Sequence, residues 1–232
     1  MLVKGGNKVA GLMVIGLLLM FQTTLVWSLY FDFEDDAQLD QWDLQGTWEI
    51  VEDDQKGSNV LSGEGTDEVI ALVGEDSWTD YTVEFEASGQ TDEISVAFRA
   101  QDPDNFLSFM IAPSLNLSEW FKKEGWQFDE NIAPRGDQLG VSIQEWYKYK
   151  LVVQGNEATV SIDEEEFANA LQLDDLSDIF QKGRVGFRQW SDSAYYDNVL
   201  ITGTDVPLTP GEPGAAVTPV AKLATTWAAL KQ

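Results

Sequence analysis

The sequence predicts an all-β fold, a two-sheet antiparallel β-sandwich. Apolar and polar residues alternate along the chain from Tyr30 to Thr202, as they do in strands that bury one face. Turn-forming residues separate the alternating stretches, and helical periodicity is nearly absent between them. Because short strands must bury their apolar faces against one another, these stretches together predict a single sandwich domain.

Two hairpins are the clearest parts of this pattern. Residues 94–100 and 106–112 alternate on either side of a turn at 102–105, and residues 147–153 and 158–162 flank a turn at 155–156. Further strands are expected at 30–34, 47–52, 59–62, 69–73, 81–87, 184–189 and 195–202, with helical turns at 36–41 and 173–180. Residues 113–145 are expected to form a long loop in which Trp120 covers an edge of the sandwich.

Residues 1–28 have the profile of a signal peptide. Lys4 and Lys8 precede an uncharged run that reaches Phe31, and Ser28 is a small residue suited to the last position before cleavage. The same run is long enough to remain as an uncleaved membrane anchor. Both interpretations predict a secreted or extracytoplasmic protein, and an uncleaved leader would hold it at the membrane or cell surface. No other membrane contact is expected.

The composition of the remaining chain changes twice. Residues 29–203 carry the strand pattern and form the predicted jelly-roll domain. Residues 204–219 are rich in Pro, Gly and Thr, which is typical of an extended linker. Residues 220–232 space apolar side chains at helical intervals, and they form either a short amphipathic helix or a disordered tail. A folded tail would serve as a sorting or attachment element.

The charge and the missing residue types exclude several functions. Forty acidic residues against fourteen basic ones give a formal net charge of −26, so nucleic acid would be repelled. The absence of cysteine excludes disulfides, and the absence of histidine excludes imidazole bases and His/Cys zinc sites. Bound calcium is the one cofactor that so many carboxylates suggest, as a structural ion.

Several strand sequences carry a family resemblance. They are Phe31-Asp32-Phe33-Glu34, Trp78-Thr79-Asp80-Tyr81-Thr82-Val83-Glu84, Val96-Ala97-Phe98-Arg99, Trp146-Tyr147-Lys148-Tyr149-Lys150, Gly183-Arg184-Val185-Gly186-Phe187-Arg188 and Tyr195-Tyr196-Asp197-Asn198-Val199. In this order the chain resembles the concanavalin A-like lectin/glucanase jelly rolls over nearly the whole of residues 30–203. Within that superfamily it is most similar to the laminin-G-like domains and to the 3-keto-disaccharide hydrolase group of exported carbohydrate-handling proteins.

The resemblance implies a function connected with carbohydrate, but it does not choose among binding, catalysis and adhesion. The leading hypothesis is an exported, non-catalytic carbohydrate-binding or cell-surface interaction module whose partner is an oligo- or polysaccharide. One alternative is an enzyme that acts on glycosidic bonds, as a glycoside hydrolase or a 3-keto-disaccharide hydrolase. Another is a structural adhesion domain.

The candidate ligand site combines planar cations with aromatic rings. Saccharides are bound by aromatic faces that cover the apolar side of a sugar ring and by guanidinium groups that donate to its hydroxyls. If the apolar faces of the strands fill the core, the opposite faces supply such groups. They are Arg99, Phe106, Arg188 and Trp190, and the long loop at 113–145 adds Trp126, beside Gly125, as a further candidate. Salt bridges to neighbouring acids are the alternative role for both arginines.

Glu84 and Glu86 are the catalytic candidates under the enzyme alternative. Glu84-Phe85-Glu86 is the nearest match to the Glu-x-Asp-x-Glu motif of the superfamily's glucanases, without the third carboxylate. In a strand the two glutamates share a face at roughly 7 Å, between the retaining and inverting spacings of glycosidases. A solvated surface pair is the simpler interpretation.

Asp197 is the candidate calcium ligand. It alternates in phase with Val199 and Ile201 and is therefore expected to point inward, where an unpaired carboxylate is costly. Because the resemblance implies a calcium ion where the first and last strands meet, Asp32 and Glu34 are the expected companion ligands. Backbone hydrogen bonds at a strand bend are the alternative partners for Asp197.

Overall fold

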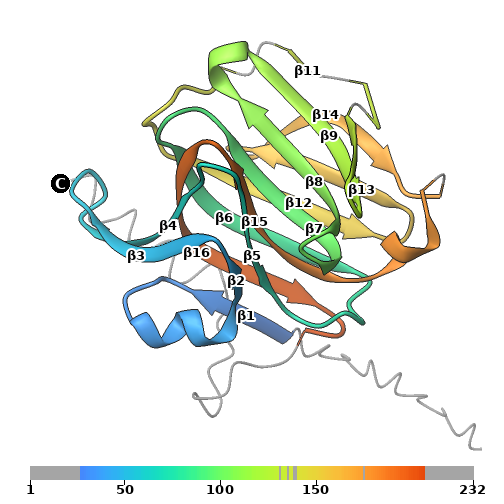
Figure 1. The fold of residues 1–232 in the computed structure, drawn as a ribbon, viewed down its shortest axis with the longest axis horizontal. Helices are drawn as coiled ribbons and strands as arrows, with labels where there is room; N and C mark the ends of the chain where they lie inside the picture. The colour runs from blue at the N-terminus through green and yellow to red at the C-terminus, as the bar shows by residue number, and fades with distance from the viewer. Residues whose placement is uncertain (1–26, 131, 135, 138–139, 175, 207–232) are drawn as a thin grey trace, which may run out of the picture.

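The computed structural model describes residues 27–130, 132–134, 136–137, 140–174 and 176–206. Over these residues the chain folds into two eight-stranded sheets, A and B, whose paired strands are antiparallel. The sheets form two layers (Figure 1). The predicted β-sandwich is confirmed. The leader at 1–26, most of the linker and the tail at 220–232 lie outside the described residues, and their roles stay predictions.

Sheet A has the order β14-β13-β12-β6-β16-β4-β3, and β1 pairs with β16 off this path. Its strands are β1 (Trp27–Phe31), β3 (Thr47–Asp53), β4 (Ser58–Glu64), β6 (Tyr81–Gly89), β12 (Tyr147–Gln154), β13 (Glu157–Ile162), β14 (Glu165–Gln172) and β16 (Ser193–Gly203). The two central strands, β6 and β16, are therefore far apart in sequence and adjacent in space.

Sheet B has the order β10-β9-β8-β7-β15-β5-β2, and β11 pairs with β9. Its strands are β2 (Asp43–Gln45), β5 (Glu68–Val73), β7 (Ile94–Asp102), β8 (Asn105–Ala112), β9 (Leu117–Glu124), β10 (Gln127–Glu130), β11 (Gly136–Asp137) and β15 (Arg184–Trp190). The described helical segments are the 3₁₀ turns η1 (Asp36–Gln41), η2 (Pro113–Leu115) and η3 (Asp178–Gln181).

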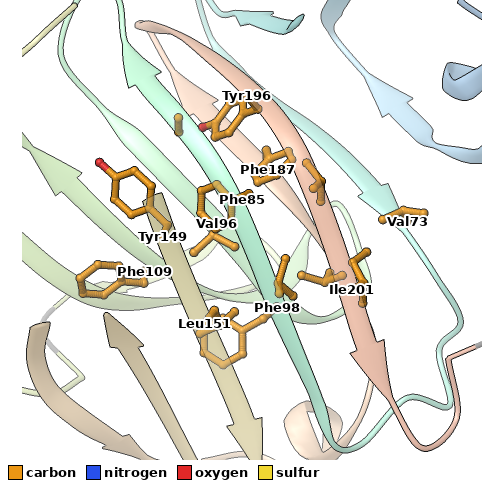
Figure 2. Packing of buried hydrophobic residues seen from close by; sticks show 14 of the residues in the cluster. Val73, Phe85, Val96, Phe98, Phe109, Tyr149, Leu151, Phe187, Tyr196 and Ile201 are labelled. Carbon is orange, nitrogen blue, oxygen red and sulfur yellow. The ribbon is translucent and has the colours of Figure 1, made fainter. Parts of the chain in front are cut away.

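An aromatic core joins the two sheets. Phe187 of sheet B stacks on Tyr196 of sheet A with ring centroids 3.9 Å apart, and Phe85 stacks on Tyr149 at 5.1 Å. Figure 2 shows these rings between the layers with Leu151, Val96 and Ile201 around them. Burial of this many apolar side chains is the main stabilising contribution in a domain without cysteine.

Every predicted strand is present, within a few residues of its expected bounds. The predicted long loop at 113–145 is wrong, because β9, β10 and β11 extend sheet B through it. Trp120 lies on β9 and is fully buried against Phe98 and Phe109, so it belongs to the core rather than to a lid. The second helical turn is shorter than expected and reduces to η3, and β2 and β14 were not expected.

Both ends of the described chain leave the sandwich at the same place. Trp27, the first described residue, pairs with Gly203 at the end of β16, and β1 lies beside β16 in Figure 1. Val206 still packs on the core, so the packed region extends slightly past the predicted boundaries at 29 and 203. Among the described residues there is no helix with the length and apolar character needed to cross a membrane.

The alternation of faces can be tested on β12. Leu151 is fully buried between the sheets, whereas its neighbour Val152 points to the opposite, partly exposed face. We expect Leu151→Ala to lower the free energy of unfolding by about 2–5 kcal/mol, because it leaves a cavity in the core. Val152→Ala is the matched control, with an expected loss of about 1 kcal/mol or less. Urea denaturation measures both, and equal losses would contradict this assignment of faces.

Candidate functional site

The outer face of sheet B, which points away from the core, carries a second set of buried side chains. Buried apolar residues from four strands form a cluster there, separate from the main core. Its members are Ile70, Leu72, Ala97, Ala100, Phe106 and Phe121, with Met110 and Phe128 packed against them. An outer sheet face is ordinarily polar and solvated, so this burial needs an explanation.

Arg188 lies at the centre of this face and is only 2% exposed. It comes from β15, where Val185 and Phe187 point into the core and Arg188 therefore points outward. Its Nε donates to Glu68 at 3.0 Å, and its Nη1 donates to Glu93 at 2.7 Å. Nη2 is buried and has no hydrogen-bond partner among the described residues. One strong donor of this guanidinium is thus left unused in a buried position, which is costly.

Aromatic rings surround the Arg188 guanidinium. Its carbon lies 5.0 Å from the ring centre of Phe121, 5.1 Å from Trp190 and 5.8 Å from Phe128. Phe128 and Trp190 also contact each other, with ring centroids 5.4 Å apart. Trp190 remains 48% exposed, so it forms the outer surface of this group. An indole face beside a planar cation offers both an apolar surface and hydrogen-bond donors to a ligand.

A second cation extends the charged network. Lys123 on β9 is buried, pairs with Glu68, and contacts Asp104 at 2.9 Å. Glu68 therefore links Lys123 to Arg188 through its two carboxylate oxygens. Phe106 lies beneath Lys123, 5.8 Å from its Nζ, and is itself fully buried. Its role is packing on this face, and a bound sugar would not reach its ring without rearrangement.

Glu93 stands just before β7 and is 6% exposed. Burial raises the pKa of its carboxyl to about 7, although the Arg188 guanidinium opposes that rise. The group therefore changes charge near neutral pH while it is in contact with the central arginine. Few carboxyl groups on the surface of a protein titrate in this range.

Trp126 is at the turn between β9 and β10 and is 87% exposed. Gly125, at a φ of +62°, gives the turn its left-handed residue. The backbone N–H of Gly125 donates to Asn105 Oδ1 at 3.0 Å. The side-chain Nδ2 of Asn105 donates in turn to the Asp102 carboxylate at 2.8 Å. The turn is thus bonded to the neighbouring β7–β8 turn, and the indole is presented to solvent on a fixed support.

Arg99 does not join this group. It adopts a left-handed φ of 50° within a bulge of β7, which reverses the expected direction of its side chain. Its Nη1 and Nη2 donate to the carbonyl oxygens of Phe180 and Gly155, at 3.4 and 3.2 Å. The expectation that Arg99 and Arg188 share one face is therefore wrong, and Arg99 holds two turns at the end of the sandwich.

Glu84 and Glu86 lie on the outer face of sheet A and are separate from Arg188. They share a face of β6, as expected, because Val83, Phe85 and Ala87 point into the core. Glu84 pairs with Lys150 at 3.0 Å, and Glu86 pairs with Lys56 at 2.5 Å. Both carboxylates are therefore neutralised by cations, which is the ordinary arrangement of a charged surface.

Asp197 also lies on the outer face of sheet A, and its predicted inward direction is wrong. Asn198 has a φ of 50°, and the register of β16 against β6 shifts after Asp197. This bulge changes the alternation, so Asp197 faces the same way as its partner Glu86. Lys56 Nζ lies 2.6 Å from Asp197 and 4.1 Å from the ring centre of Trp146. Burial nevertheless raises the pKa of Asp197 to about 6, against the lowering effect of Lys56.

The expected calcium ligands do not form a cluster. Asp32 accepts a hydrogen bond from Gln38 at 2.8 Å, and Glu34 accepts one from the Asn59 amide at 3.3 Å. Over the described part of the chain, no three acidic, histidine or cysteine side chains are grouped so that they could hold a metal ion. The Lys56 ammonium occupies the position beside Asp197 where a bound cation was expected, and calcium binding stays a prediction.

Sequence reasoning missed Glu68, Glu93 and Lys123. Glu68 and Glu93 each precede an apolar strand and look like ordinary strand-end charges, and Lys123 fell in the supposed loop. The scarcity of basic residues was the available signal, because the chain has only fourteen lysines and arginines against forty acidic residues. Recognising β9 would have placed it opposite Phe106.

The sandwich, with its long antiparallel sheets, has the jelly-roll fold of concanavalin A-like proteins. Residues 27–202 match the family model of the 3-keto-alpha-glucoside-1,2-lyase-like domain, and the chain belongs to that family. The match covers nearly the whole sandwich, including both outer faces described above. A search of curated protein sequences finds no significant match.

Solved structures share the fold at low sequence identity. The carbohydrate-binding module CBM66 from Bacillus subtilis aligns with a TM-score of 0.57 and 18% identity over 70% of this chain and 96% of the module. A Bacillus subtilis protein of unknown function with a galectin-like fold aligns with a TM-score of 0.57 and 18% identity. The alignment covers 75% of this chain and 94% of that protein. The Crh5 transglycosylase in complex with NAG aligns with a TM-score of 0.52 and 12% identity over 77% of this chain and 84% of the transglycosylase. At these identities the likeness concerns the fold alone.

The pairing of Lys56 with Asp197 can be tested through its pH dependence. Because the pKa of Asp197 is raised in the folded state, the contribution of its neutral form to stability is complete below the ordinary pKa of 3.8 and is lost as the pH rises to about 6. Lys56→Met removes the compensating charge, and we expect a loss of about 2–3 kcal/mol at pH 8 and a smaller loss at pH 5. Urea denaturation at both pH values measures this.

Lys150→Met is the matched control, because its partner Glu84 is well exposed, and we expect a loss below about 1 kcal/mol at either pH. EDTA is added to the wild type in parallel. If Lys56 is the cation that neutralises Asp197, we expect EDTA to leave the urea midpoint of unfolding unchanged. A lowered midpoint would instead support the calcium expectation.

Proposed function

We propose that this chain binds neutral saccharides on the outer face of sheet B, through Arg188 with Trp190 as the stacking ring. The observation that carries the proposal is the buried Arg188 Nη2, a strong donor without a partner, beside a half-exposed indole. A sugar hydroxyl accepts from such a donor, and the apolar face of a pyranose packs on such a ring. Arg188 is covered in this structure, so the Trp190 side chain turns outward to admit the ligand and then packs on the sugar ring.

The charge around Arg188 favours a neutral ligand. Arg188 and Lys123 are balanced by Glu68 and Glu93 on the same face, so the buried group carries little net charge. The chain as a whole is strongly negative, which disfavours anionic sugars at long range. Trp126, exposed at its bonded turn, offers a second aromatic surface for a longer oligosaccharide or polysaccharide.

The family and the fold agree with a carbohydrate-related role. The family description names a lyase acting on 3-keto-alpha-glucosides, and CBM66 is a carbohydrate-binding module of similar fold. A binding role is favoured here over catalysis, because each carboxylate contacting Arg188 is held in an ion pair. We further propose that the domain acts outside the cytoplasm, where its leader would direct it.

Binding can be measured on an array of neutral oligosaccharides, and in solution with sucrose, trehalose, maltose and cellobiose. Arg188→Lys keeps the charge but removes the unpaired donor, and we expect at least a tenfold loss of affinity, because hydrogen bonds from charged donors contribute about 1.5–3 kcal/mol. Trp190→Ala should weaken binding about fivefold or more through lost stacking. Circular dichroism confirms that each variant is folded.

Trp146→Ala removes an indole from the outer face of sheet A and is the matched control, expected to bind as the wild type. Wild-type affinity in Arg188→Lys and Trp190→Ala, or no binding to any of these sugars, would contradict the proposal. Release of reducing sugar is assayed in the same samples. Turnover that disappears in a Glu84→Gln, Glu86→Gln double variant would establish the enzyme alternative in its place.

A further inference from the structure

The contact between Glu93 and Arg188 has a geometric consequence for binding. A guanidinium presents its two Nη atoms side by side, and a bidentate contact to a vicinal diol uses both of them. In the described state Nη1 is taken by Glu93 at 2.7 Å and Nη2 is unpaired. Nη2 is therefore without a partner, and Nη1 can donate to a ligand only after Glu93 has released it.

We propose that Glu93 is a positioning residue that controls Arg188: its carboxylate holds Nη1 while ionised, and on taking up a proton it releases this donor to the saccharide. The inference rests on the proposed saccharide site and adds to it a link between binding and proton uptake. The proton comes from solvent and is bound at a carboxylate oxygen of Glu93. No bond of the sugar is made or broken.

The surroundings of Glu93 make its neutral form accessible. Burial is the largest effect and raises the pKa of Glu93 to about 7, with Asp192 and Asp92 adding to the rise and Arg188 opposing it. Asp192 accepts from Thr91 Oγ1 at 2.9 Å, and Asp92 accepts from Ser114, so both have partners of their own. When Glu93 becomes neutral, the buried site loses one negative charge, and this changes the strength of the remaining contact between Arg188 and Glu68.

Three further titratable groups lie near Glu93 and Arg188, on β16, β5 and β9. On β16, Tyr196 interacts with both Glu93 and Arg188, and burial raises the pKa of its hydroxyl far above neutral pH. On β5, Glu68 holds Arg188 Nε and remains its partner when Glu93 is neutral. On β9, Glu119 is buried on the same face and has its own interactions. Arg188 therefore keeps a fixed position while one of its donors is freed.

The expected size of the effect follows from the population of neutral Glu93. With a pKa of about 7, the neutral fraction is about one tenth at pH 8 and about nine tenths at pH 6. Because only the neutral form allows tight binding in this proposal, the apparent dissociation constant is inversely proportional to that fraction. Affinity should then increase about tenfold from pH 8 to pH 6.

The test uses isothermal titration of the purified full chain with whichever of sucrose, trehalose, maltose and cellobiose binds best. At pH 8 the titration is repeated in phosphate and in Tris, since their different ionisation enthalpies reveal the protons taken up. We expect the wild type to take up about one proton per sugar bound at pH 8. We expect Glu93→Gln, which imitates the neutral acid, to take up none and to bind at every pH as the wild type does at pH 6.

Glu84→Gln is the matched control on the other sheet and should keep the pH dependence of the wild type. Sugar binding by the wild type that is independent of pH would overturn the role of Glu93 and leave the saccharide site intact. A pH dependence that persists in Glu93→Gln would overturn it as well, because another group would be responsible. No binding by the wild type at any pH would remove the proposed function and this inference together.

Discussion

The structure depends on the contact between its two sheets. A chain without disulfides must be held together by apolar burial, and the stacked pair of Phe187 and Tyr196 joins β15 directly to β16 across the layers. The Tyr196 hydroxyl then accepts from Gln189 at 2.5 Å, so the polar end of the ring is satisfied inside the core. Because Arg188 lies between Phe187 and Gln189 in the same strand, the packing that holds the sheets together also fixes the central residue of the candidate site.

Period-two alternation predicted the strands well, because it reports directly on which side chains are buried. It failed at Arg99 and Asp197, and for one physical reason. Each lies at a β-bulge marked by a positive φ, at Arg99 itself and at Asn198, and an inserted residue moves the side chains that follow to the opposite face. A bulge depends on how two strands meet, so a single sequence read one strand at a time does not reveal it.

The candidate site was predicted only in part. Arg188 and Trp190 follow from alternation on β15, because nothing interrupts that strand beyond its first residues. Glu68 and Lys123 lie on different strands, Glu93 stands just before a third, and the three meet around Arg188 only in the folded sheet. Their pairing is a tertiary property, and so is the burial that shifts the pKa of Glu93.

The position of the site relative to the chain ends fits a tethered domain. Trp27 and Gly203 pair at one end of the sandwich, so segments attached at either side of the domain leave from that end. Strand β16 runs from Ser193 to Gly203, which corresponds to about 33 Å at 3.3 Å per residue. Trp190 precedes Ser193 by a short turn and is therefore near the opposite end. An attachment through the leader or the tail would leave the Trp190 surface directed away from the point of attachment, where a large polysaccharide has unobstructed access.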